Sequence, residues 1–136
     1  MRAREVAEEI LRVSKGGDTS GFLDLLAPDV VLEWPYHPPG VPDVLRGREE
    51  IRAFMGGGLP VTFHDHRDVV IHETADPEVV VMEYTAHGTV VASGAPFTQR
   101  VIAVIRVRDG QIVHYRDYIN PLVLMEALAG HTQRTT

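Results

Sequence analysis

The sequence contains no cysteine among its 136 residues, which excludes disulfides, thiolate zinc sites and cysteine nucleophiles together. It also has no excess of positive charge. The formal net charge is −6 at pH 7, so we expect no nucleic-acid partner, because no basic stripe is present to bind phosphates. Long hydrophobic runs are missing too. The amino-terminal stretch MRAREVAEEILRV has charges along its length, so we expect no signal peptide, no membrane contact and a cytoplasmic location.

The composition that remains is that of an ordinary globular domain. Hydrophobic residues make up 44% of the chain and charged residues 24%, and there is no low-complexity tract or internal repeat. A chain of 136 residues can bury a modest core of its own. We therefore expect one domain over residues 1–136, with no linker.

Hydrophobic spacing in the first 60 residues predicts three short helices and one strand. The first helix has an apolar stripe that consists of Ala3, Val6, Ala7, Ile10 and Val13. The second helix follows an N-cap within residues 18–20 and carries Leu25 and Leu26. A strand with the sequence VVLEW comes next, and the third helix, REEIRAFM, ends at the glycines of 56–58.

From Val61 onward the pattern changes to long strands. The segments FHDHRDVVIHE, EVVVMEYTAHGTVV, FTQRVIAVIRVR and QIVHYRDYI are rich in β-branched and aromatic residues and are separated by turn-forming residues. Asn120 and Pro121 then predict the N-cap and first residue of a closing helix that ends at Gly130. This order predicts an α+β fold. We expect a curved, mostly antiparallel sheet wrapped around the N-terminal helices, with a cone-shaped pocket where the helices leave the sheet uncovered.

Asp117 is a charged residue that the strand pattern places inside this cone. On the last strand, Val113, Tyr115, Asp117 and Ile119 share one face, and a mainly apolar face should pack under the helices. A buried carboxylate is costly unless it is paired, and burial raises its pKa toward a value useful for proton transfer. Two interpretations stay open: a structural aspartate bonded to an arginine or to the start of the last helix, or a general acid–base.

Other residues are placed near the pocket by the same reasoning. Trp34 and Tyr36 lie where the first strand leaves the sheet, and they can form an aromatic wall for a flat, ring-containing ligand. Tyr84 and Tyr115 are inward aromatics with polar tips, and Gln99 shares the inward face of its strand. All five are predicted to contact a substrate, although ordinary core and lid packing also accounts for such residues.

The chain has 7 histidines, three of them in HDHRDVVIHE, which suggests a metal site at first sight. Such a site needs a partner histidine on a later strand that faces the same way. His114 is the available partner, but its position has the opposite parity to Asp117 and should face outward. We therefore predict no metal and no cofactor, and we assign most of these histidines to the surface.

Two long stretches resemble a known family. LLAPDVVLEWPYHPPGVPDVLRGREEIRAFM is similar to the front half of the SnoaL-like branch of the NTF2-like superfamily. VRDGQIVHYRDYINPLVLMEALAG resembles the phenazine-biosynthesis A/B-type proteins within that branch. The likeness covers about residues 3 to 130. It implies the same cone-shaped fold, but a fold shared by many chemistries does not identify a reaction.

Catalytic residues of the relatives discriminate among reactions. Ketosteroid isomerase has its catalytic base where this chain has Trp34, so its mechanism is not expected here. Epoxide hydrolases of this fold share an aspartate at the position of Asp117, but they also need an arginine and a second aspartate. This chain has Tyr84 and Ala86 at those positions. An epoxide-hydrolase-like activity is therefore kept only as a second alternative.

Resemblance to the polyketide cyclases and phenazine-type proteins implies a proton donor or acceptor on the last strand, which matches Asp117. Phenazine-type proteins also have a histidine that aligns with His66 or Arg67. We predict a cofactor-independent enzyme of secondary metabolism in which Asp117 and His66 act on a cyclic, carbonyl-bearing substrate by isomerisation, cyclisation or dehydration. The alternatives are a pocket that binds a hydrophobic molecule without chemistry, and a protein-interaction domain.

The outward face of the sheet carries more apolar residues than a face in water should. Its apolar members are Val79, Val81, Ile102 and Val104. In this superfamily the equivalent face is commonly a dimer interface, so the resemblance implies a homodimer through the outer sheet face.

Overall fold

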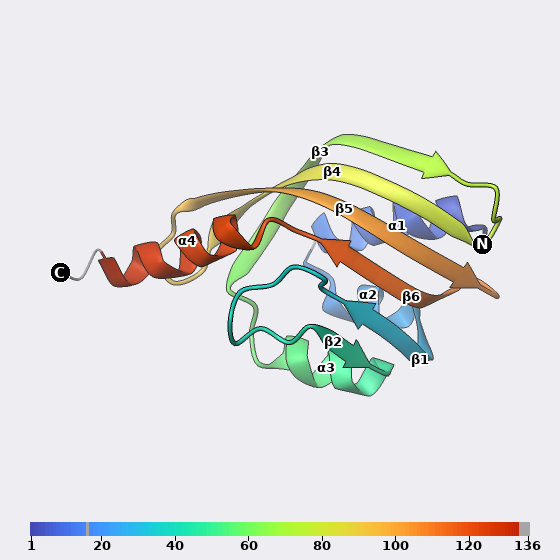
Figure 1. The fold of residues 1–136 in the computed structure, drawn as a ribbon, viewed down its shortest axis with the longest axis horizontal. Coiled ribbons are helices and arrows are strands. Elements are labelled where there is room, and N and C mark those ends of the chain that lie inside the picture. Colours follow the sequence, from blue (N-terminus) through green and yellow to red (C-terminus); the bar gives the residue numbers. More distant parts are fainter. Residues whose placement is uncertain (16, 134–136) are drawn as a thin grey trace.

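Six strands form one curved sheet, and four helices accompany it (Figure 1). The computed structural model describes residues 1–15 and 17–133. The strands are β1 (Leu26–Glu33), β2 (Val44–Arg46), β3 (Val61–Glu73), β4 (Val79–Val90), β5 (Pro96–Arg108) and β6 (Gln111–Tyr118). The helices are α1 (Ala3–Lys15), α2 (Thr19–Asp24), α3 (Arg48–Gly56) and α4 (Pro121–Gln133). Within these described ranges, no helix is long and apolar enough to cross a membrane.

The sheet has the strand order β2-β1-β6-β5-β4-β3. Strands β3 to β6 pair with their sequence neighbours in antiparallel fashion, while β1 pairs parallel to β6 and antiparallel to β2. Helices α1, α2 and α3 lie on one side of the sheet (Figure 1). The predicted α+β fold, with a curved and mostly antiparallel sheet around N-terminal helices, is confirmed.

The core lies between α1 and the inner face of the sheet. All five members of the predicted apolar stripe of α1 are buried. The sheet contributes Met82, Ile105 and Ile112, each with less than 2% of its surface exposed. Burial alternates strictly along most of β5, as the sequence pattern predicted. This packing fixes which strand positions face the interior, and therefore which side chains can reach a pocket.

The boundary between α2 and β1 differs from the prediction. The second helix ends at Asp24, and Leu26, expected in that helix, begins β1. The reason is tertiary: the Ile112 N–H donates to the Leu25 carbonyl at 2.8 Å, which draws this segment into parallel pairing with β6. The short strand β2 was not predicted at all, because three residues after a proline-rich loop carry too little periodicity to be recognised.

A bulge in β6 changes one predicted face. His114 pairs with Arg106, while Ile112 pairs with Val107, so the alternation shifts at Val113. Ile112 is therefore the fully buried residue, and the prediction that Val113 faces inward is wrong. Tyr115 lies beyond the bulge and is buried as expected.

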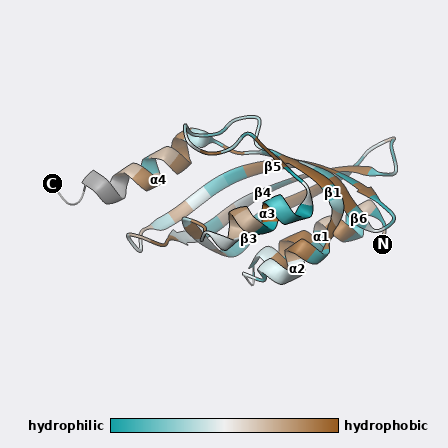
Figure 2. Ribbon diagram, turned by 90° about the horizontal axis from the view of Figure 1, so that it is seen from below, coloured by the Kyte–Doolittle hydropathy of each residue, from teal (hydrophilic) through white to brown (hydrophobic). Residues whose placement is uncertain are grey.

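The closing helix α4 extends away from the body of the sheet, and much of it is hydrophobic (Figures 1 and 2). The predicted N-cap is confirmed, because the Leu122 N–H donates to Asn120 Oδ1 at 3.0 Å. The helix continues to Gln133 rather than ending at Gly130. One side packs against a small cluster of Val61, Val90 and Phe97 through Val123, Leu124 and Ala127. Leu122, Met125 and Leu128 stay exposed.

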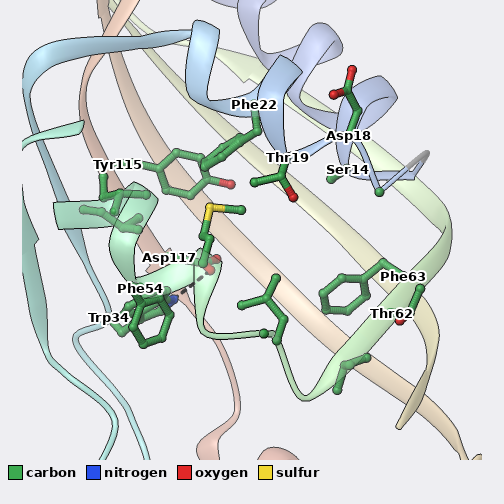
Figure 3. A pocket seen from close by; sticks show the side chains of 17 residues that line it. Ser14, Asp18, Thr19, Phe22, Trp34, Phe54, Thr62, Phe63, Tyr115 and Asp117 are labelled. Atoms are coloured by element: carbon green, nitrogen blue, oxygen red, sulfur yellow. Dashed lines mark hydrogen bonds between the residues drawn. The ribbon is translucent and has the colours of Figure 1, made fainter. Parts of the chain in front are cut away.

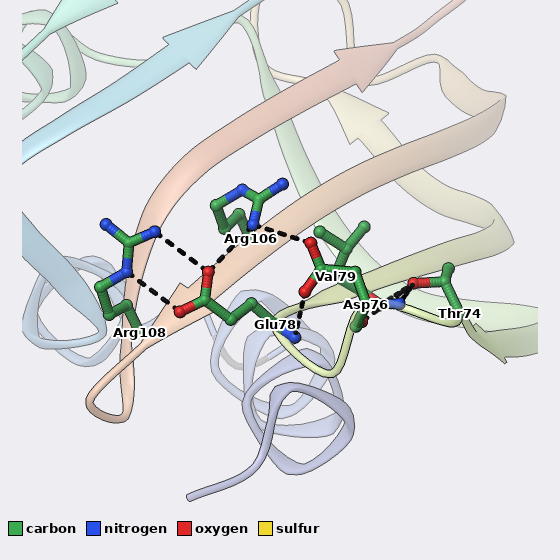
Figure 4. A network of polar contacts seen from close by, with 6 residues as sticks. All are labelled: Thr74, Asp76, Glu78, Val79, Arg106 and Arg108. Atoms are coloured by element: carbon green, nitrogen blue, oxygen red, sulfur yellow. Dashed lines mark hydrogen bonds and ion pairs between the residues drawn. The ribbon is translucent and has the colours of Figure 1, made fainter.

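An ion-pair network ties the start of β4 to the end of β5 (Figure 4). The Glu78 carboxylate accepts hydrogen bonds from Arg106 at 2.9 Å and from Arg108 at 3.0 Å. Arg106 also donates to Asp76 at 3.0 Å. The two arginines lower the pKa of Glu78 to about 2. This network lies on the surface, away from the cavity, and its role is structural.

Candidate active site

A cavity of about 500 Å³ lies between the inner face of the sheet and helices α1 to α3 (Figure 3). Its volume is in the range typical of small-molecule sites. The wall is mostly aromatic and aliphatic, and it includes Phe22, Leu32, Trp34, Ile51, Phe54, Met55 and Phe63. The cone-shaped pocket expected from the element order is therefore present, and it is open rather than filled by side chains.

Asp117 projects into this cavity from β6. The Trp34 indole Nε1–H donates to Asp117 Oδ2 at 3.0 Å. Asp117 Oδ1 is inaccessible to solvent and has no hydrogen-bond partner, although the residue as a whole keeps partial exposure. Burial raises the pKa of this carboxyl group to about 6, against the smaller opposite effect of the Trp34 hydrogen bond. Among the described residues, Asp117 bonds neither an arginine nor the start of α4, the partners that the structural interpretation expected; its partner is Trp34.

Trp34 takes up the predicted position in the cavity wall. It follows β1 directly, and its backbone N–H donates to the Asp43 carbonyl at 2.8 Å, which fixes the chain where it leaves the sheet. Its ring lies 5.5 Å from the ring of Phe54, measured between centroids. The indole therefore both holds Asp117 and forms part of an aromatic surface beside it.

Tyr115 and Tyr84 form a second polar element of the interior. Tyr115 lines the cavity, while Tyr84 lies behind it and does not. Burial is the main cause that raises the pKa of both phenols far above the ordinary value, and the Asp117 charge adds to it. Both tyrosines are therefore neutral hydrogen-bonding groups at any physiological pH.

His66, rather than Arg67, faces inward. A bulge between Phe63 and Asp65 shifts the alternation of β3, so that the His66 ring lies 4.9 Å from the Tyr84 ring in an edge-on arrangement. Arg67 points away and binds Asp65 at 2.9 Å. His66 does not itself line the cavity. Its Nε2 atom lies 2.8 Å from the hydroxyl of Ser14, which does. Burial lowers the pKa of His66, so its neutral form is favoured.

Two further predicted pocket residues lie outside the cavity lining, as Tyr84 and His66 do. Gln99 faces inward and is buried, but its side-chain amide donates to the Asn120 carbonyl and accepts from the Asn120 N–H, both at 3.1 Å. Both polar ends of Gln99 thus hold the β6–α4 junction. Tyr36 is 61% exposed, and its ring centroid lies 6.0 Å from that of Tyr118. Tyr36 therefore lies on the opposite face of the sheet from Asp117. Contrary to the sequence expectation, neither residue lines the cavity.

Several cavity residues escaped the sequence reasoning. Ser14 was one position on an amphipathic helix, and Phe54 and Phe63 belonged to elements recognised only as a helix and a strand. Their shared site depends on contacts between distant segments, which carry no local signal. Across the described part of the chain, no group of three or more histidine, aspartate or glutamate side chains is arranged to hold a metal ion. The polar groups in the cavity lining include the Asp117 carboxylate, the Tyr115 phenol and the hydroxyls of Ser14 and Thr19, all of which can form hydrogen bonds.

Comparison with known proteins finds a matching family model and similar proteins of nearly the same length. The model of the SnoaL-like domain family matches residues 7–115. An uncharacterized PhzA/B-like protein of Pseudomonas aeruginosa is 44% identical over 133 residues, which cover 96% of this chain and 92% of that protein. A solved structure from Bacillus subtilis, provisionally named an isomerase, superposes with a TM-score of 0.87 at 32% identity, covering 94% of this chain and 93% of that one.

A more distant structure shares the fold. A Pseudomonas putida protein, provisionally named a polyketide cyclase, superposes with a TM-score of 0.78. It is 22% identical and covers 93% of this chain and 98% of its own. This fold therefore occurs in proteins that have been given isomerase and cyclase names.

Proposed function

The chain belongs to the SnoaL-like family, and on that premise we propose that it is a cofactor-independent enzyme of secondary metabolism that moves a proton on a cyclic, carbonyl-bearing molecule. The reaction is an isomerisation, a cyclisation or a dehydration. One observation supports this most strongly: Asp117 Oδ1 is buried at an aromatic cavity with no protein partner. A carboxylate oxygen left free in this way can accept a proton from a bound substrate.

The proposed roles follow from the geometry. Trp34 holds Asp117 Oδ2, which leaves Oδ1 as the oxygen without a protein partner. Because Oδ1 is inaccessible to solvent, proton transfer to it requires the carboxylate to turn toward the bound substrate. A pKa of about 6 leaves Asp117 mostly ionised at pH 7, yet close enough to that pH to return the proton later in the cycle. Tyr115, a neutral phenol in the same cavity, donates a hydrogen bond to the substrate oxygen that gains charge. The aromatic wall around Trp34 stacks on the flat substrate.

Proton abstraction can be tested without knowing the natural substrate. The probe is 2-tetralone, a flat bicyclic ketone, and ¹H NMR in D₂O follows exchange of its α-protons. We expect the wild-type protein to accelerate exchange, and Asp117→Asn to lower that acceleration by about 100-fold or more. Asp24→Asn, at an exposed aspartate outside the cavity, is the matched control and should leave the rate unchanged. An Asp117→Asn variant as fast as wild type contradicts the assignment.

Binding is measured in parallel through tryptophan fluorescence. Trp34 is the one tryptophan in the chain and lies in the cavity wall, so a bound ring should change its emission. Binding without any exchange above the buffer rate identifies the alternative function, a small-molecule binding module. The hydrolase alternative is disfavoured, because no arginine lines the described cavity to assist Asp117.

We further propose that a second copy of the chain covers the outer sheet face. Ile102 is 44% exposed on that face, beside a hollow lined by Tyr36 and Tyr118. The same hollow carries charges of both signs, Arg100 and Glu83, so the face can pair with itself across a two-fold axis. Light scattering coupled to size-exclusion chromatography should give the mass of a homodimer.

A further inference from the structure

The cavity has two polar ends. Asp117 and its Trp34 partner lie at one of them, while Ser14 and Asp18 lie on the opposite side (Figure 3). Thr19, the first residue of α2, also lines the cavity. Between the two ends the wall is aromatic and aliphatic. A ligand that meets Asp117 with one group thus has a second hydrogen-bonding surface available at its far end.

Ser14 is held in place by the side chain behind it. Its Oγ atom lies 2.8 Å from His66 Nε2 and 3.3 Å from the Leu11 carbonyl oxygen. The hydroxyl has one proton and two lone pairs, so whichever tautomer His66 adopts, at least one lone pair of Ser14 Oγ stays unused by these two contacts. His66 is fixed in turn by the Tyr84 ring, and its Nδ1 atom is buried without a partner. Burying Nδ1 without a partner costs stability. The hydrogen bond between Nε2 and Ser14 is the ring contact that can offset this cost.

Charge at this end excludes one class of ligand. Asp18 and Asp117 are the charged side chains among the described residues that line the cavity, and both are acidic. Lys15 follows Ser14 in the chain, but it does not line the cavity, and its ammonium lies 3.9 Å from Asp65 Oδ1. Asp18 Oδ1 accepts the Gly21 N–H at 2.8 Å as the cap of α2, so the carboxylate is held at the rim. An anionic substituent meets repulsion here, while a neutral hydroxyl does not.

We propose that Ser14, positioned by His66, forms a distal subsite that binds a neutral hydroxyl group. The substrate class is then a ring ketone whose hydroxyl lies at the end opposite its carbonyl, and carboxylated rings are rejected. This proposal deepens the proposed function and rests on it for the placement of the carbonyl near Asp117. Ser14 contacts the ligand, whereas His66 acts through Ser14 as a positioning residue.

Three matched probes test the subsite: 2-tetralone, 6-hydroxy-2-tetralone and 2-tetralone-6-carboxylate. Their dissociation constants are measured by Trp34 fluorescence at pH 7.5. We expect the hydroxyl probe to bind about fivefold more tightly than the bare ketone, the size of one net hydrogen bond. The carboxylate probe should bind more weakly than the bare ketone. Equal affinities for the hydroxyl and bare probes overturn the proposal, and so does tighter binding of the carboxylate.

The variants separate the subsite from general damage. Ser14→Ala should abolish the hydroxyl preference, measured as the ratio of the dissociation constants of the two probes on that same variant. Ser20→Ala, at an exposed serine of α2 outside the cavity, should change neither. His66→Leu should reduce the preference, and His66→Gln, which keeps a nitrogen near the Nε2 position, should restore it. A preference that survives Ser14→Ala, or equal effects of the two His66 variants, contradicts the assigned roles.

Failure of this inference can be told from failure of the proposed function. The hydroxyl preference is a binding ratio and needs no turnover, whereas the role of Asp117 is read from α-proton exchange of the bare ketone. If the hydroxyl probe binds more tightly but Asp117→Asn exchanges protons as fast as wild type, the catalytic assignment is wrong and the subsite stands. If exchange depends on Asp117 but the hydroxyl and bare probes bind equally, the subsite is wrong and the catalytic assignment stands. If none of the three probes binds, both proposals are wrong.

Discussion

Replacing Asp117 with asparagine should stabilise the folded protein at neutral pH. Asparagine has nearly the shape of aspartate, and its carbonyl oxygen can still accept the Trp34 N–H that now binds Oδ2 at 3.0 Å. What the substitution removes is ionisation in a buried site. The unpartnered Oδ1 atom shows that no protein group compensates that charge.

The size of the effect follows from the pKa. Burial raises the pKa of Asp117 from 3.8 to about 6. Between these values the folded state keeps a proton that the unfolded state has lost, so the stability from this group is fully present below pH 3.8 and is lost as pH rises through 6. At about 1.4 kcal/mol per pH unit, the loss is about 3 kcal/mol at pH 7. Asparagine, which does not titrate, avoids that loss.

Urea unfolding of both proteins at several pH values between 4 and 7.5 measures the difference directly. The free energy of unfolding of Asp117→Asn minus that of wild type should rise by about 2.4 kcal/mol across this range, because about 0.6 kcal/mol of the loss already occurs below pH 4. Other titrating groups cancel in the subtraction. Asp24→Asn serves as control and should show no such trend. A difference that is independent of pH, or a variant less stable than wild type at pH 7.5, refutes the reasoning.

Three further outcomes are expected. Ile102→Lys should convert the proposed homodimer to a monomer in light scattering, because it places a charge on the exposed apolar face. Glu78→Gln should lower the melting temperature at pH 7, and the deficit should shrink as pH falls toward 2, where wild-type Glu78 loses the charge that binds Arg106 and Arg108. Asn120→Ala should cost about 1 kcal/mol in urea unfolding through loss of the α4 cap, and Asn120→Asp should not.

The fold was predictable from local sequence patterns wherever one element is long and regular. The stripe of α1 and the alternation of β5 each specify a buried face without reference to any other segment. The errors occur where pairing with a segment far away in the sequence determines the local structure. Leu26 joins β1 because it pairs with Ile112, 86 positions later, and Val113 leaves the inner face because β5 and β6 shift register beside it.

The site was predictable only in part, for the same physical reason. Asp117 stood out because a charged residue in an inward strand position is costly wherever the strand lies. Gln99 and Asn120 satisfy each other across 21 positions, so an inward glutamine that appeared available is fully used. Ser14 and His66 meet across 52 positions, and nothing on the helix that carries Ser14 distinguishes it from other polar residues. The alternation of side chains along a strand is enough to identify an isolated inward charge. A hydrogen bond between distant residues can be identified only from the tertiary structure.

The aspartate at position 117 is better explained by chemistry than by architecture. The fold needs an acceptor for the Trp34 N–H, and an amide oxygen meets that need as well as a carboxylate does. A carboxylate in this place lowers stability at neutral pH, because Oδ1 lies buried with no partner. In the proposed function, a substrate proton would give Oδ1 the partner that the protein does not supply. Proton transfer thus accounts for both unusual features of Asp117, its buried charge and its unpaired oxygen, while a packing role accounts for neither.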